Sequence, residues 1–137
     1  MTPSHRNSGP DREIRDLKSL RKAIQQGFEA RFLFFWSSKR NGDILGAECL
    51  SQWYPTRFTV GGTTYPTAEH YMMAEKARLF GDLRVRSRIL DARTPRAAKS
   101  LGRKVQNFDE ATWQRERLGI VVRGNTCKFR QNERLRR

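Results

Sequence analysis

The segment from Tyr65 to Tyr71 holds the clearest candidates for chemistry in this sequence. It reads Tyr-Pro-Thr-Ala-Glu-His-Tyr, so a carboxylate, Glu69, and an imidazole, His70, follow a proline closely. This order is typical of the first turn of a helix. Lys76 stands seven residues after Glu69, which places the two side chains on one helical face about two turns apart. We expect Glu69 and Lys76 to point into one cleft.

The chemistry of Glu69 has two interpretations at this point. A carboxylate in a first turn is held ionised by the helix N-terminus. Such a group suits a reaction that develops positive charge on a sugar ring or has to orient a water molecule. However, acids are also common in first turns for helix stability alone, and His70 can equally be a half-buried helix residue.

Other kinds of active site find no support in the sequence. It contains no Ser/His/Asp order, phosphate-binding loop, glycine-rich dinucleotide turn or metal-ligand spacing. Cys49 and Cys127 lie far apart and form no CxxC pattern, which argues against a disulfide framework and a zinc site. We expect neither a metal nor a cofactor.

Local patterns predict the elements that position this segment. Phe58–Val60 and Thr63–Tyr65 flank two glycines, which is typical of a tight β-hairpin. A helix is expected from about Thr67 to a glycine stop at Gly81. The apolar run Phe32–Trp36 predicts a buried strand. Further helices are expected over 11–27, 82–90, 94–102 and from 109 onward, the last weakened or broken at Gly119 and Gly124. The fold class is therefore mainly α.

Length and composition limit the number of domains and the kinds of ligand that this chain could have. The chain has 137 residues, a net charge of +14 and 36% hydrophobic residues, enough for one domain. We expect residues 1–10 to be a disordered tail and residues 11–137 to form a single domain.

The positive charge favours a phosphorylated ligand. Nucleic acid is possible but not favoured, because the basic residues are spread along the chain. No signal peptide or membrane span is evident, so a cytoplasmic location is expected. The oligomeric state stays open.

Aromatic residues gather before the Tyr65–Tyr71 segment. Most should belong to the core, and one or two could form a stacking wall for a flat ring. Trp113, in a later helix, is either a core anchor or a stacking residue in a cleft.

Taken together, these segments resemble the NADAR family, also called YbiA-like N-glycosidases. The resemblance covers roughly residues 32–135 and is strongest around Tyr65–Met73. The matching segments are FLFFWSS (32–38), GAECLSQWYPTRFTVGGTTYPTAEHYMMAEKARLFGD (46–82), TPRAAKSLGR (94–103), FDEATW (108–113) and IVVRGNTCKFRQN (120–132). It implies a compact, YbiA-like helical domain with a small β-hairpin.

The resemblance also implies a reaction and a set of site residues. It implies hydrolysis of the N-glycosidic bond between ribose and a nitrogen base, as in the phosphorylated ribosylamino-pyrimidines of riboflavin synthesis. Glu69 matches the catalytic glutamate of the family and Trp113 its essential tryptophan. The resemblance also places three basic residues near the phosphate, namely Lys76, Arg103 and Lys128. The full substrate-binding set that we predict is Trp36, Ser51, Trp53, His70, Lys76, Arg103 and Lys128.

Three alternatives remain open at this stage. One is an ADP-ribosyl-guanine hydrolase, another is a non-catalytic binder of ADP-ribose or a nucleotide, and the last is a basic nucleic-acid-binding protein. Family members continue past the position of Arg137 with a further segment that holds a second catalytic aspartate. We therefore expect the domain to be C-terminally incomplete, with weakened activity and exposed apolar surface.

Overall fold

The computed structural model describes residues 14–39 and 44–136. These residues belong to two compact units that divide between residues 33 and 34, and each unit is described by itself. The expected tail, residues 1–10, lies outside the described residues. The expectation of one domain from residue 11 stays a prediction.

The first unit contains one helix, α1 (Leu17–Gln25). Asp16 and Ser19 bond reciprocally at its start, since the Ser19 amide donates to Asp16 Oδ1 at 2.7 Å and the Asp16 amide donates to Ser19 Oγ at 3.2 Å. This capping box explains why the helix begins six residues later than the expected start at residue 11. Gly27 follows the end of α1 with a φ of 89°, as its predicted role as a stop requires.

The second unit opens on the predicted β-hairpin. Strands β1 (Phe58–Val60) and β2 (Thr63–Tyr65) are antiparallel, with Phe58 opposite Tyr65. Gly61 and Gly62 connect them with φ values of 56° and 80°, which non-glycine residues rarely adopt. The predicted hairpin is therefore confirmed.

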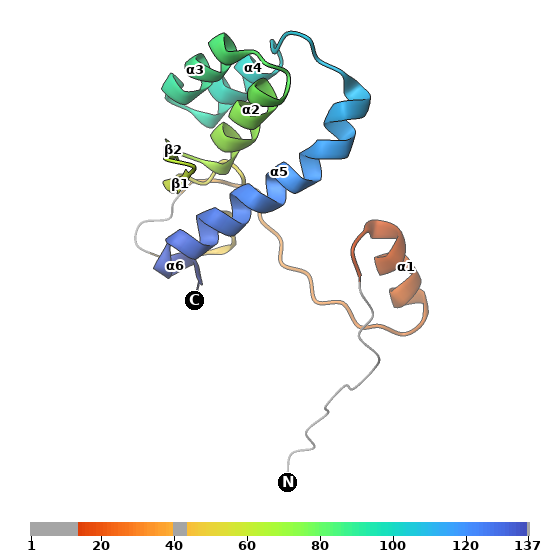
Figure 1. The fold of residues 1–137 in the computed structure, drawn as a ribbon. Helices are drawn as coiled ribbons and strands as arrows, with labels where there is room; N and C mark the ends of the chain where they lie inside the picture. Colours follow the sequence, from red (N-terminus) through yellow and green to blue (C-terminus); the bar gives the residue numbers. More distant parts are fainter. Residues whose placement is uncertain (1–13, 40–43, 137) are drawn as a thin grey trace. The chain divides into compact units, whose positions relative to one another are not determined.

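Helices make up most of the second unit, and Figure 1 shows their arrangement. Helix α2 contacts α3, α4 and α5, so it forms the centre of the unit. The helices α2 to α5 each begin after a side-chain cap, provided by Thr67, Asp82, Thr94 and Asp109 in turn. Their bounds are α2 (Ala68–Leu79), α3 (Leu83–Asp91), α4 (Pro95–Gly102), α5 (Glu110–Gln131) and α6 (Glu133–Arg136), with a short 3₁₀ helix η1 at Ala47–Leu50. The mainly α fold with a small hairpin is confirmed.

The core joins the hairpin to α2. Phe58, Tyr65 and Tyr71 are each at most 2% exposed, and the Tyr65 and Tyr71 rings meet edge to face at 5.0 Å between centroids. Ala74 and Ala77 of α2 are fully buried, and their small side chains allow neighbouring helices to pack closely. The start of α2, where Glu69 lies, is thus held on a rigid core.

The predicted buried strand at Phe32–Trp36 is wrong. These residues form no strand in the described chain, and their side chains are 42–91% exposed. The run divides between the two units, and no described strand pairs with its backbone. A short apolar run predicts burial only if a partner strand exists.

The expected break in the last long helix is also wrong. Helix α5 continues through Gly119 and Gly124 without interruption. A Cβ atom on Gly124 would lie 2.5 Å from Cδ1 of Tyr71, so this glycine allows α5 to approach the core closely. Tertiary packing therefore explains Gly124 better than helix propensity does.

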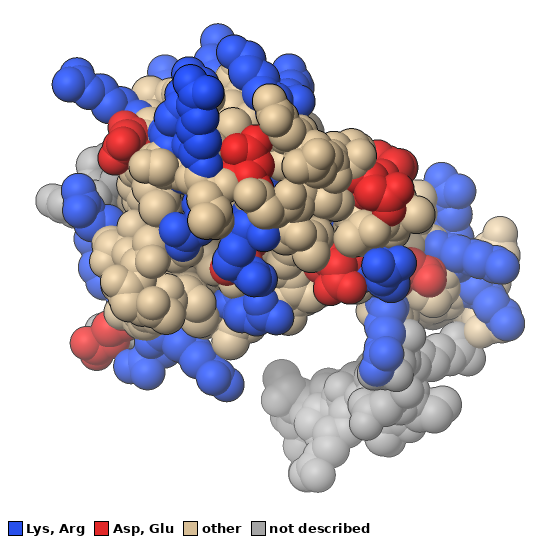
Figure 2. All heavy atoms as spheres, turned by 45° about the horizontal axis from the view of Figure 1, so that its top comes forward, with Lys and Arg blue, Asp and Glu red and all other residues tan. Residues whose placement is uncertain are grey.

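The surface is strongly basic. Figure 2 shows Lys and Arg spread widely over the visible face, with fewer acidic residues between them. Large apolar side chains are also exposed, among them Ile44, Leu118 and Val122. None of the described helices combines the length and apolar character that crossing a membrane would need.

Candidate functional site

The segment between η1 and the hairpin is fixed directly to the start of α2. The Glu69 amide donates to the Gln52 carbonyl at 3.0 Å. Within the segment, the Trp53 amide donates to Ser51 Oγ at 3.2 Å. The first amides of a helix have no acceptor inside the helix, and the Gln52 carbonyl provides one for the amide of Glu69. This arrangement brings Trp53 beside Glu69.

Lys128 holds the same segment from the side of α5. Its Nζ donates to the carbonyls of Cys49 at 2.7 Å and of Ser51 at 2.9 Å. The side-chain Nε2 of Gln52 also donates to Oδ1 of Asn125 in α5 at 3.0 Å. Lys128 is fully buried, and burial lowers its pKa to about 8. The structure thus gives Lys128 two carbonyl partners and a role in positioning the segment.

Glu69 is a buried carboxylate with incomplete hydrogen bonding. The residue is 4% exposed, and its Oε1 has no hydrogen-bond partner among the described residues. Burial raises the pKa of Glu69, while the positive charge of Lys99 and a hydrogen bond from the Trp53 side chain oppose that shift. Burial thus opposes the ionised form that a place in the first turn of a helix favours, and the expectation that Glu69 is ionised stays a prediction.

A cationic pocket lies on the exposed face of α4. Its volume is about 330 Å³. Lys99 Nζ lies 5.9 Å from the centroid of the Trp53 ring. Trp53 and Lys99 both line the pocket and both act on Glu69, so they link the pocket to the carboxylate. The lining residues are Trp53, Arg96, Lys99, Ser100 and Arg103.

Lys76 and Trp113 contact each other, and neither lines this pocket. Lys76 Nζ lies 5.5 Å from the Trp113 ring centroid and 4.5 Å from that of Phe108. Trp113 is 9% exposed and belongs to the core cluster. Among the described residues, no hydrogen bond, ion pair or ring contact joins Lys76 to Glu69. The common cleft expected for Lys76 and Glu69 therefore stays a prediction.

His70 is fully buried and uses both ring nitrogens. Nε2 lies 2.8 Å from the Ala92 carbonyl, and Nδ1 lies 2.7 Å from Thr67 Oγ1. A carbonyl only accepts, so Nε2 carries the proton and the Thr67 hydroxyl donates to Nδ1. Burial lowers the pKa of His70, which favours this neutral form. These contacts tie the start of α2 to the end of α3.

Trp36 lies apart from these groups. Its side chain is 91% exposed and stacks on Phe34, with centroids 6.1 Å apart and ring planes 11° apart. The two rings line a pocket of about 430 Å³ together with Phe35, Ser37, Lys39, Ala47 and Glu48. No described contact connects this pocket to Glu69.

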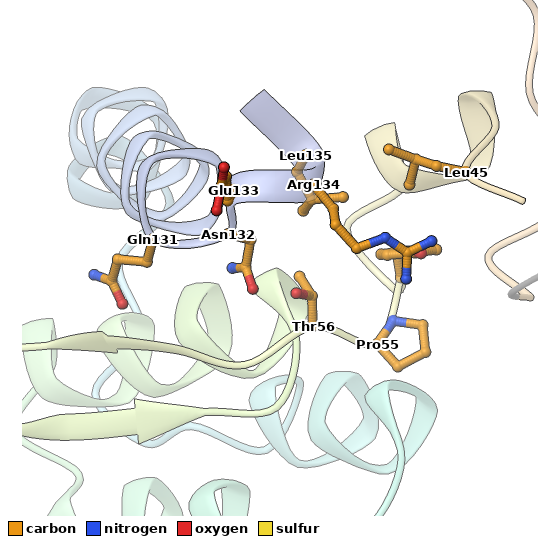
Figure 3. Close-up of a pocket in the computed structure, with 9 residues that line it drawn as sticks. Leu45, Pro55, Thr56, Gln131, Asn132, Glu133, Arg134 and Leu135 are labelled. Carbon is orange, nitrogen blue, oxygen red and sulfur yellow. The ribbon is translucent and has the colours of Figure 1, made fainter. Parts of the chain in front are cut away.

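A further pocket of about 340 Å³ lies between the segment before β1 and the end of the chain. Figure 3 shows Arg134 reaching from α6 toward the segment that holds Pro55. The pocket is lined by Leu45, residues 54–56 and residues 131–135. None of the predicted site residues lines it. The described residues also contain no cluster of three His, Cys, Asp or Glu side chains that could hold a metal ion.

Comparison with known proteins assigns the chain to a family. The family model described as the NADAR domain matches residues 34–137. The chain belongs to the NADAR family. This match covers the whole second unit, including Glu69 and the α4 pocket.

This NADAR chain is similar to two further proteins in sequence and to one solved structure. It is 37% identical over 107 residues to N-glycosidase R617 of Acanthamoeba polyphaga mimivirus, an alignment of 74% of this chain and 62% of that protein. It is 34% identical over 83 residues to riboflavin biosynthesis protein VVA0006 of Vibrio vulnificus, covering 61% of this chain and 22% of the relative. The NMR structure of the E. coli protein YbiA matches with a TM-score of 0.61 and 26% identity, covering 74% of this chain and 56% of YbiA. The NADAR chain thus spans less than two thirds of each of these proteins.

The structure brings together only part of the predicted site. Glu69, Trp53 and Arg103 are linked through the α4 pocket, and Ser51 and Lys128 support the segment beside it. Lys76 and Trp113 contact each other but do not line the α4 pocket, while His70 is enclosed and Trp36 is exposed. The roles assigned to these residues in catalysis and binding stay predictions.

Sequence reasoning missed Arg96 and Lys99. With Arg103 they follow spacings of three and four, which place three cations on one face of α4. This helical stripe was a usable signal within the predicted helix over 94–102. Its relation to Glu69 depends on Trp53, which lies far away in the sequence.

Proposed function

We propose that this chain hydrolyses the N-glycosidic bond of a phosphorylated ribosyl compound, with Glu69 as the catalytic carboxylate. One observation carries the proposal: Glu69 is 4% exposed, yet its Oε1 has no hydrogen-bond partner among the described residues. A structural carboxylate in such a place would normally be paired, because leaving it unpaired costs stability. A reacting carboxylate has to stay available to its substrate.

The chemistry of the reaction suits this carboxylate. As the bond between C1′ and nitrogen breaks, positive charge develops on the sugar ring, as in the hydrolysis of O-glycosides. Ionised Glu69 stabilises that charge. A water oxygen then bonds to C1′, and Glu69 accepts the proton that this water releases. The proton passes to the departing nitrogen, so the carboxylate returns to its starting state.

The raised pKa of Glu69 supports the role as a base. Burial makes the ionised carboxylate less stable and therefore more basic, which improves proton transfer from water near neutral pH. The Trp53 side chain holds one side of the carboxylate by a hydrogen bond.

The substrate that we propose is a ribosylamino-pyrimidine phosphate of riboflavin synthesis. One relative is named as an N-glycosidase and another as a riboflavin biosynthesis protein, and these names support the reaction and the substrate class respectively. The enzymatic activity of this chain belongs to the proposal, since it spans only part of those relatives.

The test is the release of ribose 5-phosphate from these compounds by the wild-type chain and by Glu69→Gln. We expect release by the wild type and a loss of at least about 100-fold in kcat for the variant, the scale of a lost acid or base. The matched control is Glu75→Gln, which removes the same charge from the same helix. Glu75 pairs with Arg78 through its Oε2, so its variant should keep most of the activity. Equal rates for wild type and Glu69→Gln would refute the role of Glu69.

A further inference from the structure

The face of α4 that lines the cationic pocket has features of an anion site. Three of the five residues around the 330 Å³ pocket are cations, one carries a hydroxyl and one is aromatic. Arg guanidinium groups and Lys ammonium groups are the side chains that bind phosphate most readily. The pocket is near the lower end of the volume range of small-molecule sites, roughly 300 Å³ and above.

The helix keeps these cations together on a fixed support. Residues 96, 99, 100 and 103 follow one another at helical spacing, so their side chains share one face. Ala98 and Gly102 are buried on the other side of α4, where Gly102 lies directly against Met73 of α2. The cationic face is therefore backed by the core of the unit.

The three like charges on this face lie close together, and Lys99 acts electrostatically on Glu69 without forming a salt bridge with it. No described carboxylate forms a salt bridge with Arg96, Lys99 or Arg103. Like charges three and four residues apart repel each other and weaken a helix. An anion bound among these three cations would reduce their mutual repulsion, so its binding would also stabilise the helix.

The position of the pocket relative to Glu69 also fits a ribosyl substrate. The 5′-phosphate of such a compound lies at the opposite end of the sugar from the N-glycosidic bond. Its binding site must therefore lie beside the catalytic carboxylate without including it. Trp53 and Lys99 line the pocket and contact or act on Glu69, whose Oε1 is buried and unpaired.

We propose that Arg96, Lys99 and Arg103 form the phosphate subsite of the site centred on Glu69, with Trp53 between the phosphate and the reacting bond. This inference rests on the proposed function for its substrate, but the binding of phosphate can be measured without any bond cleavage. Arg96 and Arg103 stand seven residues apart, about 10 Å along the helix axis. That span can hold one phosphate or the two phosphates of a ribosyl diphosphate.

The experiment measures binding of ribose, ribose 5-phosphate and ADP-ribose by calorimetry to the wild-type chain and to Arg96→Gln, Lys99→Gln and Arg103→Gln. These side chains are exposed, so the variants should fold. We expect ribose 5-phosphate to bind more tightly than ribose, and each variant to weaken its binding roughly tenfold or more. Tighter binding of ADP-ribose, lost in both Arg variants, would identify a diphosphate as the preferred group.

Lys104→Gln is the matched control, because Lys104 is the exposed neighbour of Arg103 and does not line the pocket. It should bind ribose 5-phosphate like the wild type. Equal weakening by Lys104→Gln, unchanged binding in the three variants, or no preference of the wild type for either phosphorylated sugar would overturn the subsite.

The subsite and the proposed reaction can fail separately. Binding that depends on these three residues, in a chain that hydrolyses nothing, would retain the subsite and reject the N-glycosidase. Hydrolysis with an unchanged KM in all three variants would retain the enzyme and reject the subsite.

Discussion

At Glu69, helix position and burial act on the same carboxylate in opposite directions. The first turn of α2 favours the ionised form, whereas removal from water disfavours it. Burial is the larger effect, so the folded pKa lies above the ordinary value of 4.5. The ionised carboxylate is therefore less stable in the folded protein than in water, and pKa shifts of this kind are common at functional sites.

This balance predicts that Glu69→Gln is more stable than the wild type at pH 7. Because the folded pKa is raised, the folded wild type binds more protons than the unfolded chain between pH 4.5 and the folded pKa. Its stability falls as the pH rises through that window, and the neutral variant avoids this loss. We expect a gain of about 1 kcal/mol, or a few degrees in Tm, by thermal melting at pH 7.

The same comparison near pH 4 provides the control. There the wild-type carboxyl is mostly protonated in both states, because pH 4 lies below both pKa values, so the difference in Tm should shrink. A wild type that is more stable than Glu69→Gln at both pH values would contradict this account.

At the scale of elements, α5 holds the second unit together from one side. Its Gln131 side chain bonds the backbone of Thr59 in β1 with both amide atoms at 2.7 Å, while Lys128 holds the segment beside Glu69. Gly124 lets the same helix contact Tyr71 of the core. One long helix thus aligns the hairpin, the Trp53 segment and α2.

The two glycines of α5 should respond oppositely to alanine. Gly119→Ala meets nothing within 4 Å, so it should stabilise the fold by about 0.5–1 kcal/mol through helix propensity. Gly124→Ala forces its Cβ against the Tyr71 ring and should destabilise by about 1–3 kcal/mol. Urea denaturation of both variants measures the difference. Stabilisation by both changes would show that Gly124 serves no packing role.

Removal of the Lys128 ammonium should loosen the Trp53 segment. Lys128→Met keeps an apolar stem but leaves the carbonyls of Cys49 and Ser51 without this donor, so we expect a loss of about 2 kcal/mol in the free energy of unfolding. Arg130→Met, an exposed change on the same helix, should alter stability by no more than about 0.5 kcal/mol. Indistinguishable denaturation midpoints for the two variants would refute the positioning role.

For the whole molecule, the net charge of +14 is the dominant property. Its basic side chains cover the visible face in Figure 2 without collecting into one patch. A diffuse field of this kind attracts phosphates generally, and the α4 pocket that we propose as a phosphate subsite lies within it.

This distribution predicts weak and non-specific binding to DNA. Retention on duplex DNA should be measurable at 50 mM salt and should fall by about 100-fold or more by 200 mM, because it depends on counterion release. A gel-shift series over both salt concentrations and two unrelated sequences tests this. Tight, sequence-dependent binding at 200 mM salt would favour the nucleic-acid-binding alternative instead.

Sequence alone determined the elements whose signals are local. The paired glycines predicted the hairpin, and Thr67 with Gly81 bounded the helix that carries Glu69, because turn geometry and helix caps depend on neighbours in the chain. The family motif around Tyr65–Met73 lies within these same elements. That is why the mainly α fold and the family were predictable.

Only the tertiary structure decided what surrounds those elements. Three features depend on residues distant in sequence. Within residues 14–39 and 44–136 no strand pairs with Phe32–Trp36, burial raises the pKa of Glu69, and two carbonyls accept from Lys128. The link from the α4 cations to Glu69 likewise passes through Trp53, from a segment some 40 residues earlier than α4. Burial and long-range contact arise from packing, and no local pattern encodes which distant residue supplies the partner.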